Sequence, residues 1–89
     1  MISVTERATK ELAAIWEMHT ATPEQVLRLA GVFDGRLSFT LDRERQGDEI
    51  VRGESGIVLV VDADLASIFA GATIDCTDTP EGARFTIDR

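Results

Sequence analysis

The feature that most restricts the fold of this chain is a run of five apolar residues, Ile57–Val61, of which four are branched at Cβ. β-branched residues favour extended backbone, and an unbroken apolar run is typical of a strand covered on both faces. Five residues fall far short of the roughly 18 that a membrane helix requires. We therefore expect this segment to be an inner strand, with no membrane association.

One amphipathic helix is predicted over residues 6–19. Thr5 is suited to cap its N-terminus, and Glu6 suits the positive first turn. Pro23 disfavours helical geometry at the residue before it, so the helix has to end ahead of this point. Apolar and aromatic residues recur at steps of three and four along one face: Ala8, Leu12, Ile15, Trp16 and His19.

Most of the remaining chain is predicted to form short strands. Leu27 and Leu29 are expected to point inward and Arg28 outward, because side chains alternate along a strand. A short second helix is predicted over 65–70, capped by Asp62 or Asp64 and closed by Gly71. Turns are predicted at Asp34-Gly35 and Thr79–Gly82. The predicted strands are 2–4, 26–33, 37–42, 49–52, 57–61, 72–77 and 83–88.

Length and charge limit the classes of function. With 89 residues the chain has room for a single domain over 1–89. Its 16 acidic and 9 basic residues give a net charge of −7, which repels phosphate backbones, so no nucleic-acid partner is expected. The first residues carry neither a basic start nor an apolar core of a signal peptide, so a cytoplasmic location is expected.

Several segments, taken in order along the chain, resemble the HesB/IscA family, the A-type carriers of iron–sulfur cluster assembly. The resemblance implies an α+β fold: a compact domain of two small packed mixed β-sheets with an N-terminal helix and a short second helix. It also implies that self-association is common among relatives. The matching segments are Met1–Ala8, Val26–Leu29, Phe39–Asp42, Gly56–Asp62, Phe69–Asp75 and Gly82–Phe85.

The chain departs from this family at the three cysteines that hold the cluster. In the family, one cysteine lies in a loop between the strands that correspond to 26–33 and 37–42, where this chain has Gly31–Arg36 and no thiol. The other two follow the last strand, where this sequence stops at Arg89. Cys76 corresponds to a structural tyrosine, so the resemblance assigns it no ligand role. The family fold is therefore expected without the family's cluster ligands.

Candidate chemistry is sparse. Cys76, the single cysteine, could be a redox thiol or one ligand of a cluster shared between subunits, but its place beside Ile74 on an alternating strand favours a buried side chain. His19, the single histidine, could be a base or a metal ligand. No second soft ligand lies nearby in sequence, and a protonated imidazole suits the negative C-terminal end of a helix, which favours a structural role. Four acids could gather around a hard cation, although capping and solvated strand edges explain them better: Asp62, Asp64, Asp75 and Asp78.

The aromatic residues are predicted to lie in the core, and Trp16, if only half covered, would suit an interface. The full set is Trp16, Phe33, Phe39, Phe69 and Phe85.

Three hypotheses follow. The first is a non-catalytic protein-binding or assembly module, not an enzyme, with no cofactor and no catalytic, cofactor-binding or metal-binding residues. Its partner is an unidentified protein, and a homo-oligomer is left open. The second is a metal or iron–sulfur protein that shares ligands across a dimer through Cys76. The third is an enzyme with a carboxylate site.

Overall fold

The protein is described by a computed structural model that covers residues 1–19, 22–53 and 56–88. The described residues contain two helices and seven strands. Neither helix is long and apolar enough to cross a membrane. The elements in order are β1 (Ser3–Val4), α1 (Glu6–His19), β2 (Val26–Phe33), β3 (Arg36–Asp42), β4 (Glu49–Gly53), β5 (Gly56–Val61), α2 (Ala63–Ile68), β6 (Thr73–Thr79) and β7 (Gly82–Asp88).

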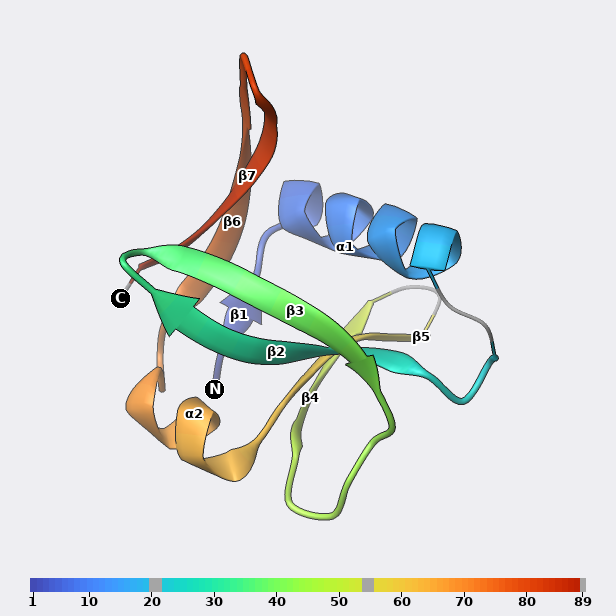
Figure 1. Ribbon diagram of the computed structural model, residues 1–89. Helices are drawn as coiled ribbons and strands as arrows, with labels where there is room; N and C mark the ends of the chain where they lie inside the picture. Colours follow the sequence, from blue (N-terminus) through green and yellow to red (C-terminus); the bar gives the residue numbers. More distant parts are fainter. Residues whose placement is uncertain (20–21, 54–55, 89) are drawn as a thin grey trace.

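The strands form two small mixed sheets (Figure 1). The three-stranded sheet has the order β1-β6-β7, in which β1 and β6 are parallel and β6 and β7 antiparallel. The four-stranded sheet has the order β3-β2-β5-β4, with the parallel pair β2 and β5 at its centre. The predicted fold class, two mixed sheets with an N-terminal and a short second helix, is therefore confirmed.

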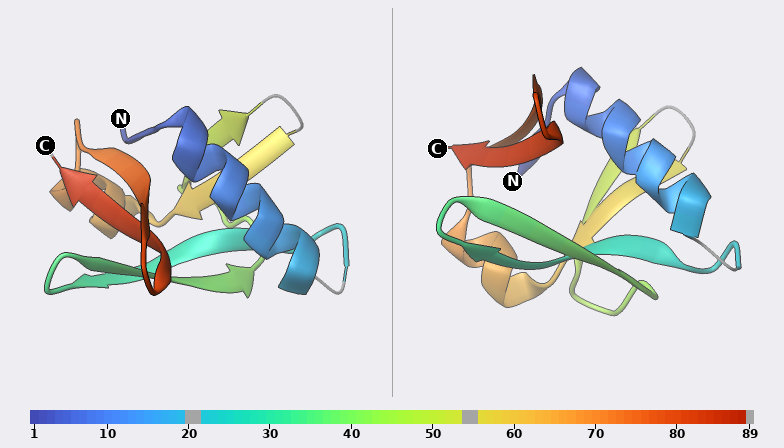
Figure 2. Two further views of the ribbon diagram at one scale, coloured as in Figure 1. Left: turned by 90° about the horizontal axis from the view of Figure 1, so that it is seen from above. Right: turned by 45° about the horizontal axis from the view of Figure 1, so that its top comes forward.

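Helix α1 packs against strands of both sheets (Figure 2). Ala8 and Leu12 on its inner face are fully buried, while Ile15 and Trp16 are half-buried. His19, predicted on the same face, is exposed at the end of the helix. The core beneath α1 contains residues of both sheets. The largest fully buried side chains of the chain are Leu12, Leu29, Leu59, Val60, Val61 and Ile74. The inner-strand prediction for β5 is confirmed at Leu59–Val61.

Side-chain caps set where the helices begin. The backbone N–H of Ala8 donates to Thr5 Oγ1 at 3.2 Å, so Thr5 caps α1 as predicted. The N–H of Leu65 donates to Asp62 Oδ1 at 3.0 Å. Because Asp62, and not Asp64, is the cap, α2 covers Ala63–Ile68 and lies two residues ahead of the predicted range.

The turn between β2 and β3 explains one wrong core prediction. Asp34 and Gly35 have φ angles of 54° and 75°, as in a two-residue type I′ hairpin turn, which confirms the predicted turn. Phe33 pairs with Arg36 directly beside this turn, at the projecting end of the hairpin, and it is 85% exposed. Phe39 and Phe85 do reach the core, where their rings meet edge to face with centroids 5.0 Å apart.

Truncating the inner face of α1 tests the role of this helix. Leu12→Ala removes a fully buried side chain, and we expect it to lower the free energy of unfolding by about 2–5 kcal/mol. Chemical denaturation followed by circular dichroism measures the change. Glu17→Ala, on the exposed face of the same helix, is the control and should change stability by less than about 0.5 kcal/mol. Equal effects of the two substitutions would contradict the proposed packing.

Candidate functional site

Cys76 lies in β6 opposite Phe85 of β7, and its side chain is part of the core. The residue is 4% exposed, which confirms the prediction of a buried cysteine. Burial raises the pKa of the thiol, and the carboxylate of Glu11 adds to the rise, whereas Arg7 opposes it. A thiol with a raised pKa is a poor nucleophile and a poor metal ligand at neutral pH, because the thiolate is the reactive form.

The acids around Cys76 have structural partners. Asp75 Oδ1 accepts hydrogen bonds from Thr5 Oγ1 at 2.7 Å and from the backbone N–H of Cys76 at 2.8 Å. These bonds lower the pKa of Asp75, the Thr5 hydroxyl contributing most. Asp78 pairs with the guanidinium of Arg7. The two carboxylates thus connect α1 and the residue before it to β6.

The other candidate ligands do not converge. Asp62 caps α2, Asp64 is exposed in the first turn of that helix, and His19 is exposed at the end of α1. Among the described residues, no three histidine, cysteine, aspartate or glutamate side chains form a group that could hold a metal ion. A cluster of the family type needs several thiolates, so the single buried thiol of Cys76 does not fit one.

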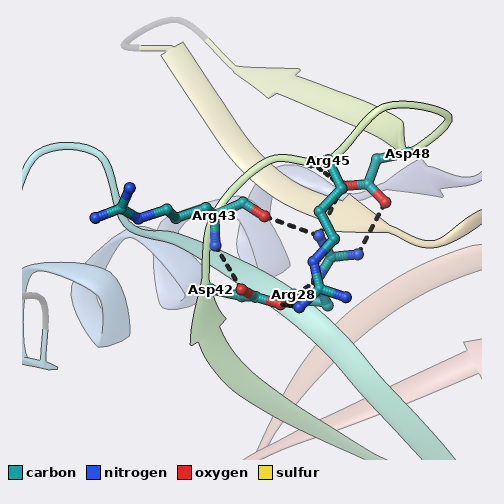
Figure 3. A network of polar contacts seen from close by, with 5 residues as sticks. All are labelled: Arg28, Asp42, Arg43, Arg45 and Asp48. Carbon is teal, nitrogen blue, oxygen red and sulfur yellow. Dashed lines mark hydrogen bonds and ion pairs between the residues drawn. The ribbon is translucent and has the colours of Figure 1, made fainter.

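The most extensive polar network surrounds Arg28, on the face of β2 opposite the core (Figure 3). Its guanidinium donates to Asp42 Oδ2 from Nε at 2.9 Å and to both carboxylate oxygens of Asp48 at 2.8 and 2.6 Å. A further N–H donates to the carbonyl oxygen of Arg43 at 2.9 Å. This network anchors the loop between β3 and β4 over the face of the sheet.

The predicted outward orientation of Arg28 is confirmed, but the side chain is buried and does not face solvent. The side chain does point away from Leu27 and Leu29, as strand alternation requires, but the β3–β4 loop covers it and leaves 7% of it exposed. Asp48, which sequence reasoning missed, is buried with it. The available signal was an arginine between two leucines, together with two aspartates, Asp42 and Asp48, in and beside the following charged loop.

Ion pairing changes the acidity of the network. The Arg28 guanidinium lowers the pKa of Asp48, against the effect of burial. The pKa of Asp42 is also lowered, first by the backbone N–H of Arg43 and then by Arg28. Both carboxylates therefore stay ionised at neutral pH, and neither is poised to exchange a proton there.

A cleft of about 340 Å³ lies between α1, the start of β2 and the β4–β5 hairpin. Trp16 is half-buried in its wall and donates from Nε1 to the carbonyl oxygen of Gln25 at 2.6 Å. A Cβ atom at Gly53 would lie 2.8 Å from Cγ2 of Val58, so any larger residue here would force Val58 or the backbone to shift. Glu17 is the one titratable residue among the described residues that line the cleft.

Comparison with known sequences gives a partial match. A Burkholderia mallei protein that carries the name iron–sulfur cluster insertion protein ErpA is 43% identical over 49 residues. Proteins of that name from Burkholderia pseudomallei and Burkholderia thailandensis match to the same extent. The match covers 55% of this chain and 40% of each relative, so the chain spans less than half of their length. No family profile matches the chain.

Solved structures match over nearly the whole chain. Escherichia coli SufA, described as involved in the biosynthesis of iron–sulfur clusters, has a TM-score of 0.72 and 17% identity over 99% of this chain and 84% of its own. A structure of IscA with a [2Fe–2S] cluster has a TM-score of 0.66 and 16% identity over 100% and 85%. A solution structure of an Aquifex aeolicus protein has a TM-score of 0.72 and 22% identity over 99% and 90%.

The fold is therefore that of the A-type iron–sulfur carriers. Together with the ErpA match, it confirms the resemblance of this chain to the HesB/IscA-like family. The difference lies at the ligands. Where the resemblance implies a cysteine-bearing loop, the chain has the two-residue turn Asp34-Gly35, and its single thiol is in the core.

Removing one carboxylate tests the Arg28 network. Asp48→Ala leaves a buried guanidinium short of its main partner, and we expect a loss of about 3–5 kcal/mol in the free energy of unfolding. Glu44→Ala, at an exposed position of the same loop, should change it by less than about 0.5 kcal/mol. Adding Arg28→Met to Asp48→Ala removes the unpaired charge, so the double variant should be more stable than Asp48→Ala alone.

The same network predicts acid sensitivity. The folded-state pKa of Asp48 is lowered, so its contribution to stability is present above the unfolded pKa of about 3.9 and is lost as pH falls through the folded pKa. Denaturation curves from pH 5 down to pH 2 should show a smaller loss of stability for Asp48→Ala than for the wild type. An identical loss would show that Asp48 is not paired in the folded state.

Proposed function

We propose that this protein is a non-catalytic protein-binding module of iron–sulfur cluster biogenesis, which keeps the carrier fold and holds no cluster on residues 1–89. In this proposal those residues act as one domain, located in the cytosol, where a lone thiol stays reduced. Its partner is a protein, and nucleic acid is no partner for a chain with a net charge of −7.

The observation that carries the proposal is the position of the Cys76 sulfur. Cys76 is 4% exposed and belongs to the core cluster that also contains Ala8 and Leu12 of α1 and has Phe85 and Ile87 of β7 packed against it. Cluster iron must reach several thiolates at once, and a sulfur inside the core cannot be shared with a neighbouring subunit without opening the sheet. The reading of Cys76 as a shared ligand has no support from this geometry.

The polar groups support a non-catalytic role. Asp75 and Asp78 pair with Thr5 and Arg7, and Asp48 pairs with Arg28. The described lining of the cleft beside Trp16 holds Glu17 but no second acid or base, and the hydroxyl of Thr9 there donates to the carbonyl oxygen of Thr5 at 2.9 Å. An enzyme with a carboxylate site would need a concave pocket that holds acids with raised pKa values.

Anaerobic reconstitution tests the absence of a cluster site. The chain, its Cys76→Ala variant and IscA as the positive control are incubated with iron and sulfide and then desalted. We expect visible cluster absorbance and bound iron for IscA, and neither above background for the chain or its variant. Stable cluster absorbance in the chain that Cys76→Ala abolishes would overturn the proposal and support a shared thiolate ligand.

Capture from lysate tests the binding role. The immobilised chain is compared with an unrelated domain of similar size and charge, and the bound proteins are quantified by mass spectrometry. We expect iron–sulfur biogenesis proteins to be enriched on the chain over the control. Their absence from the enriched set, with the bait folded by circular dichroism, would contradict a role in that process.

A further inference from the structure

The cleft beside Trp16 lies where α1 passes over β5 and the start of β2 (Figure 2). Its volume of about 340 Å³ falls within the range of about 300–1,000 Å³ that is usual for ligand sites. The apolar residues of its lining come from α1, from β5, and from β2 and the segment before it: Ala13, Trp16, Pro23, Val26, Ile57 and Val58. A hollow with this lining suits an apolar side chain of another molecule.

The Trp16 ring is held in place at the wall of the cleft. Its Nε1 donates to the carbonyl oxygen of Gln25 at 2.6 Å, and the side chain packs in part against the core. The ring is half-buried and also lines the cleft. Tryptophan is enriched among the residues that dominate binding energy at interfaces, and its ring attracts cations more strongly than other aromatic side chains.

Glycine keeps the cleft free of side chains on the side of the β4–β5 hairpin. A Cβ atom at Gly53 would lie 2.8 Å from Cγ2 of Val58 and 3.4 Å from Cγ2 of Thr9 on α1. A side chain at Gly53 would therefore begin in the space between the hairpin and the helix. Gly56, which pairs with Gly53 across the end of the hairpin, lines the same cleft. The two glycines leave room for a side chain from another molecule.

The charge of the cleft selects a cationic partner. Glu17 is exposed, and it is the one titratable residue among the described residues of the lining. It forms no ion pair within the described part of the chain. The net charge of −7 attracts basic partners over a longer range. A guanidinium group at the cleft can therefore approach both the Glu17 carboxylate and the Trp16 ring.

We propose that this cleft binds a partner protein through a short segment in which an arginine is flanked by apolar residues. An apolar side chain of the segment enters the hollow beside Trp16, and the arginine guanidinium pairs with Glu17. This inference deepens the proposed function and rests on its protein-binding role. It does not require that the partner belong to iron–sulfur cluster biogenesis.

Another groove of the chain makes no such selection. It has a volume of about 510 Å³, and it lies between the start of β3 and the β6–β7 hairpin. Its lining includes Arg36 and Arg84 but also Glu81. Because charges of both signs lie along this groove, it favours neither a basic nor an acidic segment.

Peptide titrations followed by fluorescence test the choice of ligand. Trp16 is the single tryptophan, and the chain has no tyrosine, so its emission reports on the cleft. The probes, blocked at both ends, are the peptide Leu-Leu-Arg-Leu and its forms with glutamine or glutamate in place of arginine. We expect a saturable change in emission with the arginine peptide, and dissociation constants roughly threefold higher for glutamine and roughly tenfold higher for glutamate. No saturable change with the arginine peptide, or equal or tighter binding of either other peptide, would overturn the proposal.

Two pairs of variants locate the binding. Ala13→Leu adds a side chain to the lining, and Ala14→Leu adds the same side chain at the next position, outside the described lining. Glu17→Lys reverses the charge in the cleft, and Glu44→Lys makes the same change in the β3–β4 loop. All four positions are exposed, so the fold should be retained, as circular dichroism can check. We expect Ala13→Leu and Glu17→Lys to raise the dissociation constant of the arginine peptide roughly tenfold, and the two controls less than about threefold. Equal effects within each pair would show that the peptide does not bind in the cleft.

The same variants separate this inference from the proposed function. If the wild-type chain captures iron–sulfur biogenesis proteins from lysate, and Ala13→Leu and Glu17→Lys capture them equally well, the cleft is not their binding site and the inference is wrong. If the arginine peptide binds in the cleft and no such protein is captured, the proposed function is wrong and the cleft remains a binding site for a basic segment.

Discussion

The structure depends on α1 packing across the two sheets. Ala8 and Leu12 are fully buried and share one core with Leu29 and Leu59 of the larger sheet and Ile74 of the smaller one. A chain of 89 residues buries a limited share of its surface, so its small core depends on a helix that packs against strands of both sheets. The same core includes Cys76, which is 4% exposed.

The chain shares the fold of the A-type carriers, and we propose that it does not share their cluster chemistry. The sheets, both helices and their order match SufA and IscA at TM-scores of 0.72 and 0.66. The turn at Asp34-Gly35 is short, and the one thiol is a core side chain with a raised pKa. The described surface exposes charged side chains and also four large apolar ones, Met1, Met18, Phe33 and Ile68.

Local rules allowed much of the fold to be predicted. The three- and four-residue spacing, with Thr5 as the cap, gave the bounds of α1, and the Asp34-Gly35 turn gave the first hairpin. The burial of Cys76 followed from strand alternation. The cover over Arg28 could not be predicted in the same way, because it depends on the β3–β4 loop bringing Asp48 back across 20 residues of sequence. The prediction that Phe33 lies in the core was wrong for a related reason. The residue type indicates an apolar side chain, but its exposure depends on where the end of the β2–β3 hairpin lies in the fold.

The central claim is that the sulfur of this chain belongs to the core and not to a metal site. Native mass spectrometry of the protein, isolated without oxygen from cells that assemble iron–sulfur clusters, tests it most directly. The account predicts the mass of the metal-free polypeptide, as monomer or dimer. A mass increased by iron and sulfide, and lost on exposure to air, would contradict it.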